Sequence, residues 1–249
     1  MAVYDIRSIS QVGTSEPFEL QIARGQIPGH SFVHKIGEVP AMSQGQTGTV
    51  WDVNDTDYPW SAFDTAGTLT VDRASASDAD KNVIISGLDA DYNPLTETVT
   101  LTNATGNATT NSFKRVFEIS MNGASVNVGN VTIKKGATTV GLILAGIGQS
   151  LMGIYTIPAG FTGYITQGVM TVQEGADATG TFFVRALGDR FRVGHRFEVS
   201  GGGEYHYAFT VPYRAPEKTD IDVRATVRSN NARVTAAFDI ILIKEQGPL

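Results

Sequence analysis

Alternating side-chain oxygens are the first feature of this sequence that could do chemistry. Asp89, Asp91 and Asn93 occupy alternate positions in the run DADYN, which is how a calcium-binding loop begins. Pro94, however, stands where such a loop needs glycine, and Thr100 stands where it needs a bidentate glutamate. Aspartate and asparagine in this order also form hairpin turns, and we favour that interpretation.

Other candidate metal ligands are weaker. The run DVNDTDYPW (52–60) offers three aspartates and an asparagine, either to a hard cation or to solvent in an ordinary loop. His30 and His34 would share a helix face, as a zinc site requires, but in an extended segment they lie about 13 Å apart. His195 and His206 stand alone in strand-like patterns. We expect no metal, no cofactor and structural roles for the histidines.

The composition narrows the classes of function. With no cysteine, thiolate metal sites and cysteine nucleophiles are excluded, and no G-x-S-x-G motif is present. A formal net charge of −6 argues against binding nucleic acid. No apolar run is long enough to cross a membrane, and the start MAVYDIRSISQVG lacks the pattern of a secretory signal. We therefore expect a noncatalytic protein, made in a cytoplasm, that binds neither nucleic acid nor membrane.

Two sets of residues are candidates for binding a partner. Arginine is concentrated after residue 184 beside several acids, which is typical of subunit interfaces, although a surface laced with ion pairs is the alternative. The candidate interface residues there are Arg185, Arg190, Arg192, Arg224 and Arg228. Tyr58 and Trp60, in a loop rich in turn residues, are candidates for binding a glycan.

The elements that must position these residues are strands. Apolar and polar residues alternate in most segments, turns recur at short intervals, and segments rich in helix formers are nearly absent. In DIDVRATVRS the residues Ile221, Val223, Ala225 and Val227 are predicted to face a core, with Asp222 among those on the opposite face. NVIISGLDADYNPLTETVTLT is predicted to be a hairpin with its turn at DADYNP.

These patterns predict an all-β fold of two antiparallel β-sandwich units behind an extended N-terminal arm. The arm covers 1–30, where Phe18, Leu20 and Ile22 alternate with polar residues, as in a segment that pairs with a neighbour; an ordinary first strand is the alternative. The first unit covers 31–153. The second covers 154–249 and is jelly-roll-like, because about seven short strands follow one another with regular turns.

Several stretches resemble a family of virion structural proteins from tailed phages of marine bacteria and cyanobacteria. They are FELQIARGQIPGH (18–30), TVWDVNDTDYPW (49–60), GLDADYNPLTETVTL (87–101), TTNSFKRV (109–116), YTIPAGFTGYITQ (155–167) and PEKTDIDVRA (216–225). The resemblance implies a noncatalytic virion protein, such as a decoration, collar, adaptor or fibre-base component, present in many copies. Its implied partners are further copies, as a trimer or ring, and other virion proteins of capsid, neck or tail. A carbohydrate-binding, host-recognition module of the virion is the alternative function.

Overall fold

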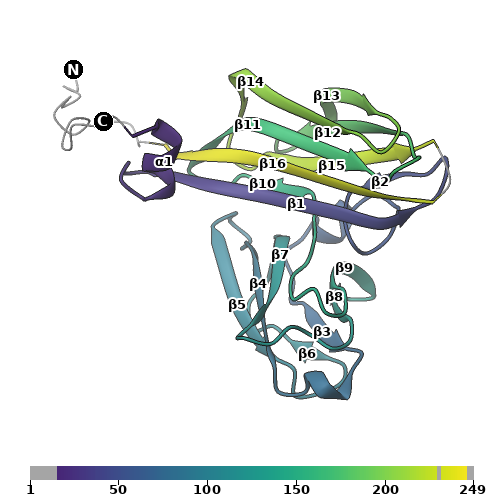
Figure 1. Ribbon diagram of the computed structural model, residues 1–249. Coiled ribbons are helices and arrows are strands. Elements are labelled where there is room, and N and C mark those ends of the chain that lie inside the picture. The colour runs from purple at the N-terminus through teal and green to yellow at the C-terminus, as the bar shows by residue number, and fades with distance from the viewer. Residues whose placement is uncertain (1–15, 229–230, 246–249) are drawn as a thin grey trace.

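A computed structural model describes residues 16–228 and 231–245 of the chain. This part is nearly all β, in antiparallel sheets, as the sequence predicts. Figure 1 shows two parts, a body of long strands at the top and a smaller unit below it, which we call the inserted unit. No helix within the described ranges is long and apolar enough to cross a membrane.

The body consists of two sheets, A and B. Sheet A has the order β1 (His30–Met42), β16 (Ala232–Lys244), β11 (Phe161–Val172) and β14 (Glu204–Ala215). Sheet B has the order β10 (Ile154–Thr156), β15 (Asp220–Val227), β12 (Ala178–Arg185) and β13 (Arg192–Val199), and β2 (Thr47–Thr49) pairs with β15 beyond the end of β10. One hydrophobic cluster fills the space between them, because alternate residues of each strand face inward.

The inserted unit has two smaller sheets around a second hydrophobic cluster. Sheet C has the order β6 (Asn107–Ala108), β3 (Thr70–Arg73), β8 (Val131–Lys135) and β9 (Thr138–Ile143). Sheet D has the order β5 (Pro94–Thr100), β4 (Asn82–Leu88) and β7 (Arg115–Asn122). Two short 3₁₀ helices, Trp60–Phe63 and Ala76–Asp78, lie in its connections. The predicted hairpin is confirmed, since β4 and β5 pair with Val83 opposite Val99.

The strand pairings differ from the predicted division at residue 31. Strand β1, which we expected in the first unit, pairs along its length with β16, from His30 opposite Ile243 to Met42 opposite Ala232. The inserted unit therefore lies between β2 and β10, two strands of the body, in chain order. Local alternation shows that β1 is a strand, but it carries no information about a partner some 200 residues later.

The extended arm is a wrong prediction where the structure describes it. Phe18–Ala23 form the helix α1 rather than a strand, and residues 1–15 lie outside the described chain. Glu, Leu, Gln and Ala favour a helix, and Phe18 and Ile22 are four residues apart, so they share a helix face as well as a strand face. Gly25, with φ of 67°, follows the last turn in the left-handed conformation that often ends helices.

Candidate interaction surface

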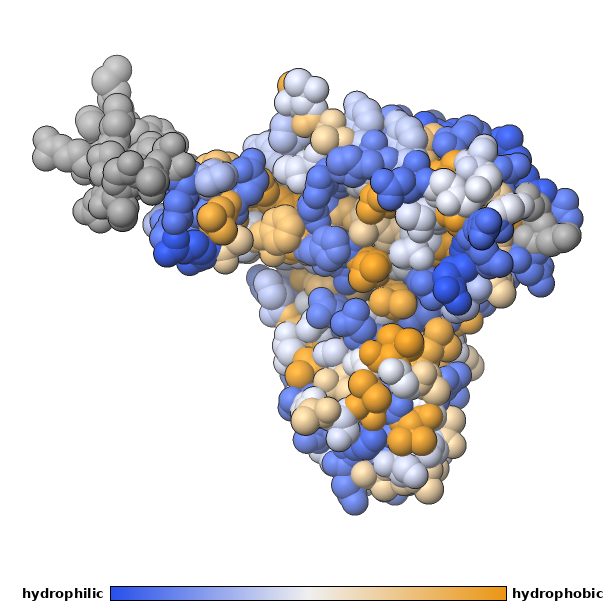
Figure 2. Space-filling view, viewed as in Figure 1, coloured by the Kyte–Doolittle hydropathy of each residue, from blue (hydrophilic) through white to orange (hydrophobic). Residues whose placement is uncertain are grey.

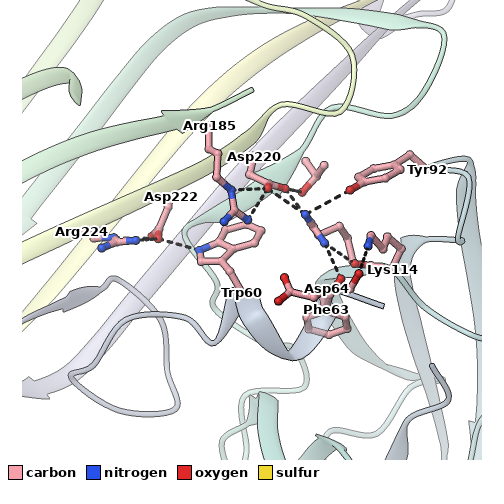
Figure 3. Close-up of polar contacts among 11 residues, drawn as sticks. Trp60, Phe63, Asp64, Tyr92, Lys114, Arg185, Asp220, Asp222 and Arg224 are labelled. Carbon is pink, nitrogen blue, oxygen red and sulfur yellow. Dashed lines mark hydrogen bonds and ion pairs between the residues drawn. The ribbon is translucent and has the colours of Figure 1, made fainter. Parts of the chain in front are cut away.

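A network of buried charges joins the inserted unit to sheet B. Asp220, on β15, accepts hydrogen bonds from Arg115 of β7 (Nε to Oδ1, 2.8 Å), from Arg185 of β12 (Nη2 to Oδ2, 2.7 Å) and from the Thr156 hydroxyl (2.7 Å). Figure 3 shows Asp220 beside Arg185, with Trp60 close to both. The ring centroid of Trp60 lies 5.5 Å from the Arg115 guanidinium carbon, within cation–π range.

Asp222 is the second carboxylate of this network. It accepts hydrogen bonds from the Trp60 indole N–H (2.9 Å), the Thr49 hydroxyl (2.8 Å) and Arg224 Nε (2.9 Å). Burial raises the pKa of Asp222, against the effect of these donors and of the Arg224 charge. Asp222 lies on the face of β15 opposite the core, as predicted, but the inserted unit covers this face and Asp222 is fully buried.

The charges of this network compensate one another. Burial opposes the charge of Arg115, but its hydrogen bonds and attraction to Asp220 raise the pKa of Arg115 overall. Its other N–H groups donate to the Phe63 and Lys114 carbonyl oxygens, at 3.2 and 2.8 Å. Because both carboxylates are paired and buried, this network is suited to holding the two parts of the chain together and not to binding a substrate.

The predicted interface arginines fall into two groups. Arg185 and Arg224 belong to the network, with 23% and 15% of their side chains exposed. Arg192 pairs with Asp189, and Arg228 donates to Glu198 and Thr179, with side chains 61% and 58% exposed. Arg190 is exposed as well. Only this second group offers guanidiniums to a partner, and its role in an interface stays a prediction.

Tyr58 and Trp60 lie in the interior. They are 2% and 6% exposed, and their rings meet edge to face at 4.9 Å, with Trp51 against the other side of Tyr58. Desolvation raises the pKa of the Tyr58 hydroxyl. The glycan hypothesis needed both rings at the surface, and the structure instead uses them in the hydrophobic cluster of the inserted unit.

The predicted arm residues divide between core and surface. Ile22 is 3% exposed, whereas Phe18 and Leu20 are 48% and 46% exposed. The Phe18 ring meets the ring of His30 on β1 edge to face, with centroids 6.0 Å apart. Helix α1 thus lies at the end of sheet A (Figure 1), and two of its large apolar side chains are exposed.

The outer face of sheet A, turned away from sheet B, continues this apolar surface. The register aligns Phe32 with Ile241 and Tyr164 in one row across the sheet, and Ile36 with Ala237 and Val169 in another. Phe32 is 47% exposed, whereas Ile241 beside it is only 8% exposed. In Figure 2, hydrophobic atoms lie among hydrophilic ones over this part of the body, next to α1.

A row of polar side chains crosses the same face. His34 bonds to one oxygen of Asp239, Gln167 donates to the other, and His206 contacts the Gln167 side-chain oxygen at 3.3 Å. The four residues come from β1, β16, β11 and β14, so the row spans the sheet. Sequence reasoning missed this surface. The available signal was AAFDIILIK, whose last residues are apolar on both faces.

The predicted oxygen clusters are turns. Asp89 Oδ1 accepts hydrogen bonds from the backbone N–H groups of Asp91 and Asn93, each at 2.9 Å, which confirms the turn at DADYNP. Asp55 accepts from the Ser43 backbone N–H at 3.2 Å. Among residues 16–228 and 231–245, no three histidine, aspartate or glutamate side chains come together in a way that could hold a metal ion.

Comparison with known proteins gives distant likenesses. No protein-family model matches the chain, and no curated protein sequence matches it. Among solved structures, the chain is similar to a protein of naturally occurring empty particles of cowpea mosaic virus, with 7% identity, 75% of this chain and 90% of the other covered, and a TM-score of 0.24. A chain of the infectious bursal disease virus Gt strain is 11% identical, with 93% and 83% covered and a TM-score of 0.19. At these TM-scores the likenesses establish no shared function.

Proposed function

We propose that the chain is a noncatalytic structural component of a tailed phage particle, such as a decoration, collar, adaptor or fibre-base protein. It acts by packing the outer face of sheet A and helix α1 against a second copy, in a trimer or ring that also contacts other virion proteins. The sequence resemblance to virion proteins supports the phage particle as its location.

The order of the strands supports a jelly roll for the body. Numbering its eight strands along the chain without β2 and the inserted unit, sheet A has the order 1-8-3-6 and sheet B the order 2-7-4-5. This is the order that two interlocked Greek keys produce. Jelly rolls occur in viral capsid domains and also in lectins. Sheets C and D form the second, smaller sandwich of this proposal.

The observation that carries the proposal is the outer face of sheet A. In a sheet with one face in solvent, the side chains on that face are normally polar. Here the outward-pointing side chains include five apolar or aromatic ones, next to the exposed Phe18 of α1: Phe32, Ile36, Tyr164, Val169 and Ile241. The two apolar rows lie on either side of the polar row that includes His34 and Asp239, and exposed apolar side chains gathered on one face in this way mark a protein–protein contact. Glycan binding through Tyr58 and Trp60 is not favoured, because both rings are buried.

Measurement of the molar mass in solution tests the proposal. The natural chain is expected to sediment as a trimer or larger ring, and Phe32→Lys to shift it to monomer, because a charge would be buried without a partner. Val128→Lys is the matched control, since Val128 is 58% exposed on the inserted unit and Phe32 is 47% exposed. A natural chain that stays monomeric at about 100 µM, which limits self-association to about 5 kcal/mol, would refute the packing proposal. A density map of the phage particle, in which the chain should fill repeated positions, tests the location.

A further inference from the structure

The body is open along one long edge, between β13 and β14. These are the last strands of sheets B and A, and Figure 1 shows them at the top of the body, away from the inserted unit. Inward-facing residues in the middle of sheet A are buried, as Met170 and Phe238 show with 0% and 2% exposure. At the open edge Tyr207 also faces inward by its register with Gly168, yet it is 36% exposed.

Aromatic rings from both strands line this edge. Phe197 stacks on Tyr205 with centroids 4.6 Å apart, and His195 lies 4.4 Å from Tyr207, which meets Phe209 edge to face at 4.7 Å. Together with core residues they line a shallow, open apolar groove. Because the rings touch one another across the gap, an occupant would lie over them, along the mouth of the groove.

The backbone of β14 indicates what kind of occupant fits. One edge of β14 pairs with β11, and its other edge has no strand partner among the described residues. The pairing with β11 is also interrupted, since Gln167 is opposite Ala208 and Ile165 is opposite Tyr213. The four intervening residues of β14, 209–212, have no partner on β11, and Val211 among them is 79% exposed. An unpaired strand edge beside apolar pockets is the arrangement that binds an extended peptide by adding a strand.

The first residues of the chain have the composition of such a peptide. Residues 2–12, AVYDIRSISQV, contain two valines, two isoleucines and a tyrosine, which favour strands, and no glycine or proline. Fifteen residues precede Glu16, and a chain of that length spans up to about 50 Å. They lead into α1 at the end of sheet A, beside the exposed Phe18.

We propose that residues 2–12 of one copy bind as an added strand along β14 of a second copy and cover the aromatic groove. This rests on the proposed self-association. Within one chain the described residues begin at Glu16, just before α1, and α1 contacts β1, which β16 and β11 separate from β14. To reach the groove of the same chain, residues 2–12 would have to extend from there across sheet A, whose outer face a neighbouring copy occupies in the proposed assembly.

The absence of cysteine in the sequence allows a direct test. Ser8→Cys and Ala208→Cys are made in separate full-length chains, so that a disulfide between the two sites can form only between copies. Ala124→Cys is the matched control, because Ala124 and Ala208 are both exposed alanines and Ala124 lies on the inserted unit. The mixture of Ser8→Cys with Ala208→Cys is expected to cross-link about tenfold faster, or more, than the mixture with Ala124→Cys, since docking raises the local concentration of the two thiols. A synthetic peptide of residues 2–12 should slow the first reaction and leave the second unchanged.

Each other outcome overturns this inference. Equal rates for the two mixtures would show that the segment does not reach β14. A chain carrying both Ser8→Cys and Ala208→Cys that cross-links only within itself, with no product from the mixture of single variants, would assign the groove to the chain's own segment. The molar mass of the same samples separates the two proposals: an oligomer without the selective cross-link removes only the strand addition, whereas a monomer removes the self-association as well.

Discussion

Asp52 lies where the chain leaves the body for the inserted unit, and its carboxylate is only half satisfied. One oxygen accepts a hydrogen bond from the Leu151 backbone N–H at 2.9 Å, whereas the other is buried without a partner. Burial raises the pKa of Asp52 to about 7, the Leu151 hydrogen bond opposes this, and nearby Glu38 adds to it. A single side chain therefore links the stability of this junction to pH near neutrality.

The direction of this pH dependence follows from where the proton is held. Below about pH 4 the Asp52 carboxyl is protonated in both states, so its burial has no electrostatic cost. Between about pH 4 and pH 7 the unfolded chain releases the proton while the folded chain keeps it, so the free energy of unfolding falls as pH rises. Above about pH 7 this decrease in the free energy of unfolding is complete, and it amounts to no more than about 4 kcal/mol.

Asp52→Asn should remove this loss. The amide oxygen can still accept from the Leu151 N–H, and no charge is buried, so the variant should be more stable than the natural chain at pH 8 by about 1–3 kcal/mol. The difference should shrink toward pH 4. Urea unfolding at several pH values measures it, and Asp91→Asn, at an exposed turn, controls for the substitution itself. A gain at pH 8 that persists unchanged at pH 4 would contradict the assigned cause.

Gly37 of strand β1 lies in close contact with both segments that join the body to the inserted unit. A Cβ atom on Gly37 would lie 2.1 Å from the Val50 carbonyl oxygen and 2.3 Å from the Gly153 backbone nitrogen. Val50 and Gly153 belong to the two segments that carry the chain into and out of the inserted unit, and the Gly153 N–H donates to the Val50 oxygen at 2.8 Å. Because all the obstructing atoms are backbone, no side chain can turn away to make room.

Gly37→Ala should therefore destabilise the chain by about 3 kcal/mol or more, because the added methyl would separate β1 from both connecting segments. Gly168→Ala, on β11 of the same sheet, is the matched control, since the nearest atom to its added Cβ is 3.6 Å away. Chemical unfolding of both variants measures the difference. Equal losses for the two would show that the close approach at Gly37 does not hold the elements together.

The elements show how far sequence reasoning reaches in this chain. Alternation correctly gave the strands of the body and the inward face of β15, because a two-residue period depends only on neighbouring positions. Alternation did not predict the burial of Asp222, because the inserted unit, which is distant in sequence, covers that face of β15. It also did not predict the helix Phe18–Ala23, because apolar residues four positions apart share a face in a helix and in a strand. The outer face of sheet A could not be found, since it is assembled from four strands whose pairing the sequence does not encode locally.

At the scale of the whole molecule, the chain has two hydrophobic clusters that meet at Phe117 and at one set of charges. Phe117 packs against both clusters, and the Asp220–Arg115–Arg185 and Asp222–Trp60–Arg224 contacts lie between the sheets that enclose them. Coupling between two such cores decides whether they unfold together or one after the other.

Arg115→Leu tests this coupling. The substitution leaves Asp220 with Arg185 and Thr156 and removes the one guanidinium that β7 contributes to the junction, so we expect a loss of about 3–5 kcal/mol in the free energy of unfolding. Calorimetry of the natural chain should show one transition, whereas the variant should show two, because each hydrophobic cluster then unfolds at its own temperature. Arg192→Leu is the matched control, since Arg192 pairs with Asp189 at the surface, where solvent screens the ion pair, and its loss should leave the unfolding transition almost unchanged. A single transition in Arg115→Leu, lowered no more than in Arg192→Leu, would mean that the two cores are coupled through their connecting segments and not through the buried charges.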